Sequence, residues 1–300
     1  MASATQLCRA TNISGLRERA ARLISPEGFA KGLAFRPRTN DVFIATFPKC
    51  GTTLLQQIVH GLRTKGDMDF VEITEVIPWI ELAHDMDLDP EDEQKADPRA
   101  YKTHLAWDLV PKGGRYIYVI RDPLAVVVSF YHFFEGWYFE TGSIDFESFA
   151  LEFVLPGTQS RRYWEHLASW WPQRSSERVL FLCYEDIVRN LRGSVERVAS
   201  FIGLDTDAER IDIASRQADI EFMAGYPTLW DDNLLRAKRN EACGIPADSA
   251  TTKVRGPSNK QTTEMTPAVK EAWDLCWSEI VEPATGHASY GELRRAIAQQ

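Results

Sequence analysis

The segment Thr46-Phe-Pro-Lys-Cys-Gly-Thr-Thr-Leu54 carries the residue types of an anion-binding site. Lys49 supplies a full positive charge, and Thr52 and Thr53 supply hydroxyl donors. The apolar run before the segment predicts a buried strand, and helical spacing after it predicts a helix that begins near Thr53. A tight turn at Gly51 would then aim backbone N–H groups and the helix dipole at one point. The segment therefore predicts a site for phosphate or sulfate.

This segment differs from the common nucleotide-binding loop G-x-x-x-x-G-K-[ST]. Lys49 precedes the glycine, and no glycine lies four positions upstream. By itself the segment also fits an ordinary strand-to-helix turn with a solvated lysine, so other segments must decide.

A second candidate anion site follows the apolar run 115–120. Arg121 comes directly after this run, Pro123 stands where a helix would begin, and Ser129 lies two turns into that helix. Arg121 and Ser129 can therefore meet one anion. The alternative is structural: an Arg121–Asp122 ion pair that caps the helix, with Ser129 packed in the core.

A candidate general base lies at the end of the short run Tyr101-Lys-Thr-His-Leu105. A lone histidine is more often structural than catalytic. At the carboxyl end of a strand, however, His104 would open onto the same edge as Lys49 and Arg121. A neutral imidazole there could take a proton from an incoming hydroxyl or amine.

Strand patterns alternate with helical patterns around these residues. We expect strands at 41–46, near 101–103, at 115–120 and at 179–183, and helices at 53–64, 124–134, 161–172 and 187–202. This alternation predicts an α/β fold with a central parallel sheet, helices on both faces, and ligands at the carboxyl ends of the strands. The ranges 83–99 and 240–263 read as two long loops.

Composition narrows the class of protein. Of the 300 residues 44% are hydrophobic and 26% charged, which is ordinary for a globular protein. The net charge of −9 argues against a general nucleic-acid partner, and no run is long enough to predict a membrane partner. The five cysteines show no paired spacing, so we expect free thiols, no metal site and a cytoplasmic location.

Taken together, these motifs resemble the cytosolic sulfotransferase family. Phe47–Thr53 is similar to the family's 5′-phosphosulfate loop, and Tyr118–His132 to its 3′-phosphate segment. Tyr101–Leu105 resembles the strand with the catalytic histidine. Trp164–Trp171, Tyr184–Asp186 and Val254–Gly256 are also similar. The resemblance spans roughly 40–280 in the expected order.

The resemblance implies sulfuryl transfer from 3′-phosphoadenosine 5′-phosphosulfate (PAPS) to a small-molecule acceptor, leaving adenosine 3′,5′-bisphosphate (PAP). It implies His104 as the base, Lys49 at the leaving oxygen and Lys102 as a transition-state contact. The implied nucleotide-binding residues are Lys49, Cys50, Gly51, Thr52, Thr53, Leu54, Arg121, Ser129, Tyr184, Ile220, Met223, Arg255 and Gly256. Trp79, Trp107, Phe133 and Trp137 are the candidate acceptor-binding residues. No metal is required.

The sequence departs from the family pattern at several positions. Leu54 and Ile220 stand where the family has aromatic residues against the adenine, and the late Arg-Lys-Gly triplet reads Val254-Arg-Gly256. The dimerisation signature survives only in part, as Thr262, Thr266-Pro267 and Glu271, so we expect either a monomer or a homodimer.

Two other functions compete with sulfuryl transfer. A nucleotide kinase of related fold would need a lysine after the glycine and an acidic residue for magnesium. A non-catalytic PAP-binding relative would need no base at position 104. We expect residues 1–40 to form an N-terminal extension and the start of the domain, and 41–300 to form a single sulfotransferase-like domain.

The acceptor is suggested only by charge. The stretch 81–97 is strongly acidic and is similar to a family loop at the acceptor entrance; its acidic residues are Glu81, Asp85, Asp87, Asp89, Glu91, Asp92, Glu93 and Asp97. An acidic rim there would attract a cationic acceptor such as an amine. A solvated loop that only keeps the protein soluble is the alternative.

Overall fold

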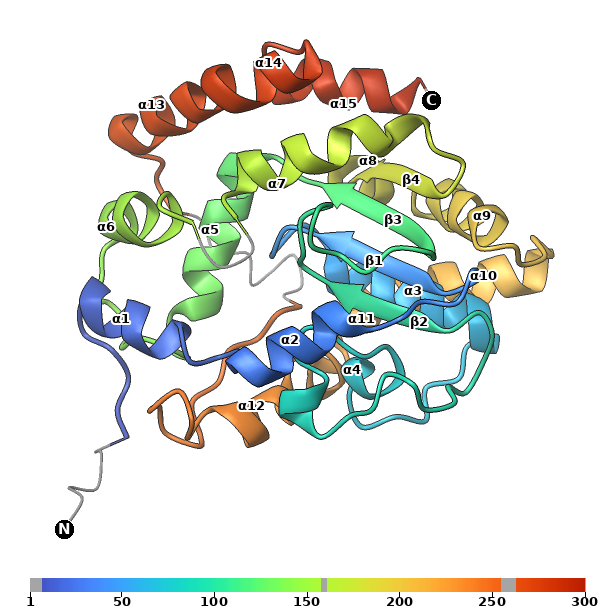
Figure 1. The fold of residues 1–300 in the computed structure, drawn as a ribbon, viewed down its shortest axis with the longest axis horizontal. Coiled ribbons are helices and arrows are strands. Elements are labelled where there is room, and N and C mark those ends of the chain that lie inside the picture. Colours follow the sequence, from blue (N-terminus) through green and yellow to red (C-terminus); the bar gives the residue numbers. More distant parts are fainter. Residues whose placement is uncertain (1–6, 158–160, 255–262, 300) are drawn as a thin grey trace.

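The centre of the protein is a four-stranded parallel sheet, described here in a computed structural model that covers residues 7–157, 161–254 and 263–299 (Figure 1). The strands are β1 (Val42–Thr46), β2 (Ala100–Thr103), β3 (Arg115–Ile120) and β4 (Val179–Cys183), in the order β2-β1-β3-β4. Ala45 of β1 pairs with Thr103 of β2 and with Tyr118 of β3. The predicted parallel sheet and its four strands are confirmed.

Both faces of the sheet are buried, and apolar residues occupy most positions of the strands. Val42, Ile44, Ile117 and Val119 face one core, where they meet α3 (Thr52–Thr64), α9 (Leu191–Phe201) and α10 (Ala208–Gln217). These helices bury one apolar stripe each, so they form a single layer against the sheet.

The opposite face of the sheet is aromatic. Phe43 stacks on Tyr101 and Tyr116, with ring centroids 5.4 and 5.3 Å apart, and Tyr118 stacks on Trp170 at 4.7 Å. Helix α7 (Tyr163–Trp170) packs on this face through Trp170, and the buried side of α5 (Pro123–Phe134) belongs to the same core. Three more, α13 (Pro267–Cys276), α14 (Glu282–Thr285) and α15 (Tyr290–Ala298), form an outer layer over α7 (Figure 1).

The predicted helix 187–202 is wrong in its continuity. The chain forms α8 (Tyr184–Arg189) and α9, which are separated at Asn190. The backbone of Asn190 is extended at φ −135°, and its side chain accepts a hydrogen bond from Gly193 N at 3.1 Å. An asparagine that caps the second helix thus ends the first.

Short helices complete the molecule. They are α2 (Pro26–Ala34), α4 (Ile73–Val76), α6 (Phe146–Ser148), α11 (Ile220–Ala224) and α12 (Asn233–Arg239), with irregular helical turns at 84–86, 149–154, 171–175, 227–229 and 277–281. No helix among the described residues is long and apolar enough to cross a membrane.

The N-terminal helix α1 (Ile13–Ala20) is built into the fold. Its Leu16 is fully buried, and Ala10 just before it donates a backbone hydrogen bond to Tyr138 O at 2.8 Å. Arg239 of α12 donates to Leu23 O at 2.9 Å, which fixes the chain that follows α1.

Candidate active site

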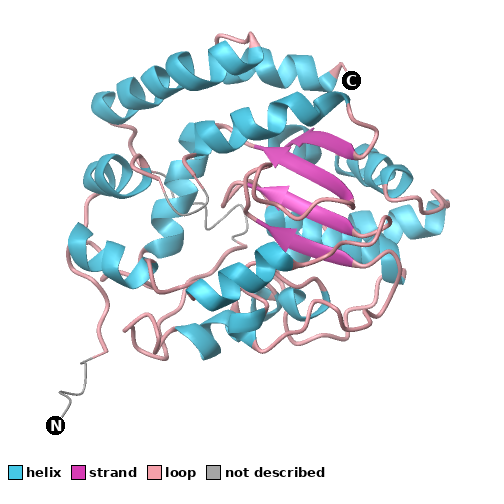
Figure 2. Ribbon diagram, in the orientation of Figure 1, coloured by secondary structure: helices cyan, strands magenta, loops and turns pink. Residues whose placement is uncertain are grey.

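The strand order places a crevice between β1 and β3. After β1 the chain forms β2 on one side and then returns to form β3 on the other, and parallel sheets bind ligands at such switch points. The strands point the same way, so their carboxyl ends share one edge (Figure 2). A cavity of about 1300 Å³ opens there, lined by residues of the loops after β1, β2 and β3.

The loop after β1 has the geometry of an anion cradle. Lys49 and Gly51 both have a left-handed backbone, at φ 70° and 96°. A Cβ at Gly51 would lie 2.6 Å from Tyr184 Cδ2, so only glycine lets the loop pass this ring. No side chain caps α3, which leaves the N–H groups of its first turn for a ligand.

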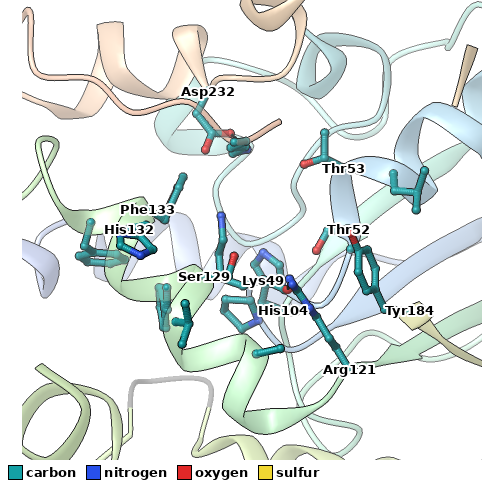
Figure 3. Close-up of a pocket in the computed structure, with 18 of the residues that line it drawn as sticks. Lys49, Thr52, Thr53, His104, Arg121, Ser129, His132, Phe133, Tyr184 and Asp232 are labelled. Atoms are coloured by element: carbon teal, nitrogen blue, oxygen red, sulfur yellow. Dashed lines mark hydrogen bonds and ion pairs between the residues drawn. The ribbon is translucent and has the colours of Figure 1, made fainter. Parts of the chain in front are cut away.

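Lys49 turns into the cavity, where its Nζ lies 3.7 Å from the ring centroid of Phe133 (Figure 3). Thr52 and Thr53, from the start of α3, line the same space. Thr52 Oγ1 lies 2.6 Å from Thr46 Oγ1 at the end of β1. The loop therefore brings together the cation and the hydroxyls that the sequence indicated.

Arg121 connects the loop after β3 to the loop after β1. Its Nη1 donates to Lys49 O at 2.9 Å, and its guanidinium carbon lies 4.5 Å from the ring centroid of Tyr184. Asp122 caps α5 by accepting from Leu124 N at 2.8 Å, and makes no ion pair with Arg121 among the contacts described. Ser129 lines the cavity from α5. Arg121 and Ser129 thus share the cavity with Lys49.

His104 lies at the carboxyl end of β2, as expected. Its Nδ1 lies 2.8 Å from Thr46 O, a backbone acceptor, so Nδ1 carries the hydrogen and Nε2 has the lone pair. Burial holds the pKa of His104 well below its usual value, and neighbouring Lys102 lowers it further. The imidazole is therefore neutral, as a proton acceptor must be.

Two neighbours hold the ring of His104 in place. Trp79 packs edge-on against it with centroids 4.9 Å apart, and the backbone N of His104 donates to Glu81 Oε1 at 2.6 Å. Glu81 is fully buried, and burial raises its pKa. Glu81 was expected in an acidic rim at the acceptor entrance, but it is buried and supports the backbone of His104.

Lys102 precedes His104 by one β-strand repeat and lines the cavity on the same face. Its Nζ lies 3.8 Å over the ring centroid of Trp79. Burial lowers the pKa of Lys102 to about 8, and Lys253 contributes to the shift. At neutral pH the amine is still mostly protonated but readily loses its proton.

The candidate acceptor residues divide into two groups. Trp79, Phe133 and Trp137 line the cavity. Trp107 does not: it packs against Trp170 at 5.1 Å and Tyr116 at 5.4 Å, under the aromatic face of the sheet. Trp107 follows β2 closely in sequence, but the chain turns away from the cavity at Leu105 and Ala106, which are both buried.

Most of the candidate nucleotide residues also line the cavity. Leu54, Tyr184, Ile220 and Met223 form an apolar strip next to the loop after β1. Cys50 is different, because its side chain is fully buried in the core behind the loop. Arg255 and Gly256 lie outside the described residues.

The acidic stretch 81–97 does not border the cavity, because none of its residues belongs to the described lining. Several of its carboxylates have local partners instead. Asp85 accepts from Ser25 N at 2.8 Å, Asp87 pairs with Lys238 at 2.8 Å, and Glu91 pairs with Arg99 at 3.3 Å. The predicted acidic rim at the acceptor entrance is therefore wrong.

Sequence reasoning missed several polar residues of the cavity, among them His132, Asp232 and Lys253. His132 Nε2 lies 2.8 Å from Thr263 Oγ1, and Lys253 Nζ forms an ion pair with Asp232. Asp232 and Lys253 come from segments without a strand, so no sheet pattern could have placed them at the site. Among the described residues, no group of three or more His, Cys, Asp or Glu side chains could hold a metal ion.

Comparison with known proteins identifies the family of this chain. Residues 39–280 match the model of the sulfotransferase domain. Amine sulfotransferase of Oryctolagus cuniculus is 30% identical over 210 residues, which cover 67% of this chain and 68% of that protein. Sulfotransferase 1E1 of Homo sapiens is 31% identical over 205 residues, covering 65% of this chain and 70% of that protein.

Solved structures show the same fold. A mouse sulfotransferase complexed with PAP superposes with a TM-score of 0.64 at 19% identity, covering 92% of this chain and 94% of that one. Retinol dehydratase in complex with androsterone and inactive cofactor PAP superposes with a TM-score of 0.60 at 21% identity. The superposition covers 92% of this chain and 93% of that one. The match to the domain model extends over most of the chain, so this protein belongs to the sulfotransferase family, whose members are PAPS-dependent enzymes.

Proposed function

We propose that this enzyme transfers the sulfuryl group of PAPS to a hydroxyl or amine of a small-molecule acceptor, with His104 as base. One observation carries the assignment of residues. The cavity combines a neutral imidazole, whose Nε2 has the lone pair, with Lys49, Arg121 and the uncapped N-terminus of α3. Such a site can remove a proton and stabilise an anion at the same time.

The donor would occupy the crevice between β1 and β3. Lys49, Thr52 and Thr53 lie on one side of it and would hold the 5′-phosphosulfate. Arg121 and Ser129 lie on the other and would hold the 3′-phosphate. Tyr184, Leu54, Ile220 and Met223 would contact the adenine. Arg255 and Gly256 remain proposed donors to the 3′-phosphate from the family resemblance alone.

The reaction would break the bond between sulfur and the bridging oxygen of PAPS and form a bond from sulfur to the acceptor oxygen or nitrogen. The acceptor proton would pass to Nε2 of His104, and the bridging oxygen would leave as part of PAP with two negative phosphates. Lys49 would stabilise the charge on that oxygen, and Lys102 the charge on the transferring group. Positioning supplies the rest of the catalysis.

The acceptor would bind in the apolar part of the cavity, against Phe133 and Trp137. Because the acidic stretch lies elsewhere, it no longer supports a cationic acceptor. We also propose a single domain over 41–300, a cytoplasmic location and a monomer or homodimer. The location is supported by the five cysteines, all of which are free thiols.

Thermal unfolding with two nucleotides tests the donor site. PAP should raise the melting temperature strongly, because a ligand at a hundred times its Kd adds about 2.7 kcal/mol to the native state. Adenosine 5′-monophosphate should raise it much less, since it leaves Arg121 and Ser129 unused. Ser129→Ala should reduce the difference between the two nucleotides, and equal shifts in the wild type would refute the 3′-phosphate assignment.

Radiolabelled PAPS with a panel of acceptors tests the activity itself. A labelled acceptor establishes sulfuryl transfer. Binding of PAP without transfer to any acceptor would favour a non-catalytic relative, and phosphate transfer from ATP with magnesium would favour a kinase.

A further inference from the structure

Asp232 has an unusual position for an aspartate that precedes a helix. It stands directly before α12 with a left-handed backbone at φ 55°, and its side chain does not cap the helix. Asp122, Asp207 and Asp219, by contrast, each cap the helix that follows them. A left-handed backbone at a residue with a side chain costs on the order of 1–3 kcal/mol and is often found at functional sites.

Another residue does the capping at α12. Glu72 Oε2 accepts the hydrogen bond of Leu234 N at 3.0 Å, from a distant part of the chain. Asp232 is thereby released from the helix end. Its carboxylate forms part of the cavity wall, in the same space as Phe133 and Lys49 (Figure 3).

The charges around Asp232 keep it ionised. Burial opposes ionisation, but Lys253, Lys102 and Lys49 together hold the pKa of Asp232 below its usual value. Lys253 forms an ion pair with it through Nζ, while the backbone N of Lys253 donates to Asp231 Oδ1 at 2.7 Å. In the contacts described, Lys253 donates a hydrogen bond to Oδ1 of Asp232 and not to Oδ2.

A structural role alone explains this arrangement poorly. Burying two charges usually costs as much as their attraction returns, so an ion pair in a cavity wall is a weak stabilising device. The other carboxylates of the described lining, Asp122 and Asp219, cap helices. Asp232 is therefore the acidic group of this lining that remains for a ligand.

We propose that Asp232 recognises a second hydrogen-bond donor of the acceptor, a hydroxyl or an ammonium group, distinct from the group that is sulfated. The acceptor is then amphiphilic, with an apolar body against residues such as Phe133, Trp137 and Leu235. This inference rests on the proposed function, since it takes the cavity as an acceptor site. A site built to bind a polar group strongly rejects analogues that lack it.

Calorimetric titration of the PAP-saturated protein tests the inference without turnover. Three para-substituted phenols of similar shape serve as probes, and they differ only at the end of the ethyl chain. Tyrosol has a second hydroxyl there, tyramine has an ammonium group, and 4-ethylphenol has no polar group. Tyrosol or tyramine should bind roughly ten- to hundred-fold more tightly than ethylphenol, the usual effect of a hydrogen bond to a charged group. Equal binding of all three, or no binding of any, would overturn the proposal.

Two variants separate recognition from folding. Asp232→Asn should lose the preference, but it leaves Lys253 buried without its partner and should also lower the melting temperature. The double variant Asp232→Asn with Lys253→Met removes both charges and should recover stability. The proposal holds if the preference for tyrosol or tyramine stays lost in the double variant, and it fails if the preference returns.

Binding of PAP in the same titrations keeps the two hypotheses apart. Normal binding of PAP without a preference among the phenols contradicts the role of Asp232 only. Absence of PAP binding contradicts the proposed donor site, and the phenols are then titrated into the protein alone, where the same preference is required.

Discussion

A single backbone carbonyl decides which nitrogen of His104 can react. Thr46 O accepts the hydrogen of Nδ1, and Thr46 belongs to the strand that leads into the anion cradle. The same residue contacts Thr52 through its hydroxyl. The base and the cradle are therefore held by one residue, so a shift of either would disturb both.

Replacing the base should separate catalysis from binding. His104→Ala should lower kcat by roughly 10²–10⁴-fold, the usual contribution of general-base catalysis, and leave PAP binding almost unchanged. Steady-state kinetics and calorimetry measure the two effects. His287→Ala, a histidine outside the cavity, is the matched control and should retain wild-type kcat; near-normal kcat in His104→Ala would return that residue to a structural role.

The ionisation of Lys102 should determine how kcat/KM changes at alkaline pH. His104 is neutral because burial holds its pKa well below 6.5, so activity should persist as pH falls through 6.5. Burial lowers the pKa of Lys102 to about 8, and above that pH its stabilising charge is lost. The kcat/KM profile should decline above about pH 8, and Lys102→Met should be less active and lack this decline.

Gly51 should tolerate no side chain. Its φ of 96° is strained for other residues, and a Cβ would lie 2.6 Å from the ring of Tyr184. We expect Gly51→Ala to destabilise the fold by about 1–3 kcal/mol and to weaken PAP binding. Urea unfolding and calorimetry measure these effects; Gly286→Ala, at φ 78° with open space around it, tests how much of the loss is backbone strain alone.

At the scale of elements, the pattern of strands and the residues that directly follow them could be predicted from sequence. Lys49, His104 and Arg121 each follow a parallel strand, and parallel strands end at one edge, so their meeting follows from topology. Trp107 and the stretch 81–97 were placed wrongly, because their positions depend on how long loops pack. Asp232 and Lys253 meet only through such packing, which no local pattern encodes.

One interior histidine connects α7 to the strands. His166 lies 2.9 Å from Tyr118 Oη through Nδ1, and its Nε2 lies 3.1 Å from Leu105 O, so the neutral ring satisfies both contacts. Burial lowers its pKa to about 3. Below pH 6.5 the unfolded chain therefore binds a proton at this residue that the folded protein does not.

This difference in proton binding should appear in the pH dependence of stability. The contribution of His166 to the free energy of unfolding is complete above pH 6.5. It falls by about 1.4 kcal/mol per pH unit as the pH decreases toward about 3. In His166→Gln, an amide that can make both contacts, this loss should be absent. Urea unfolding of both proteins between pH 7 and 5 measures the difference in slope, and parallel slopes would contradict a neutral His166.

Over the whole molecule, negative charge is spread away from the site that binds an anion. The net charge is −9, yet the acidic stretch 81–97 contributes no side chain to the cavity lining. Glu81 is buried beneath His104 and Asp85 accepts from Ser25 N, whereas the other carboxylates pair with bases such as Lys238 and Arg99 or face solvent. Exposed charges more than a Debye length of about 8–10 Å apart are largely screened at physiological salt.

Neutralising exposed charges of this stretch should therefore leave catalysis unchanged. Asp92→Asn combined with Glu93→Gln should give kcat/KM within about two-fold of wild type for cationic and neutral acceptors at physiological salt. Both residues are exposed. If the double variant lowered kcat/KM for cationic acceptors only, the result would support electrostatic steering of acceptors by this stretch.

The wall formed by α1 and the residues after it has a consequence for the order of folding. Leu23 and Ile24 line the cavity, and the hydrogen bond from Arg239 that holds Leu23 joins positions 216 residues apart. Contacts of such high sequence separation form late, because the intervening chain must first lose its freedom. We expect the sheet and α3 to gain protection from hydrogen exchange first during refolding. The acceptor cavity would close only afterwards, so folding intermediates would expose its aromatic lining.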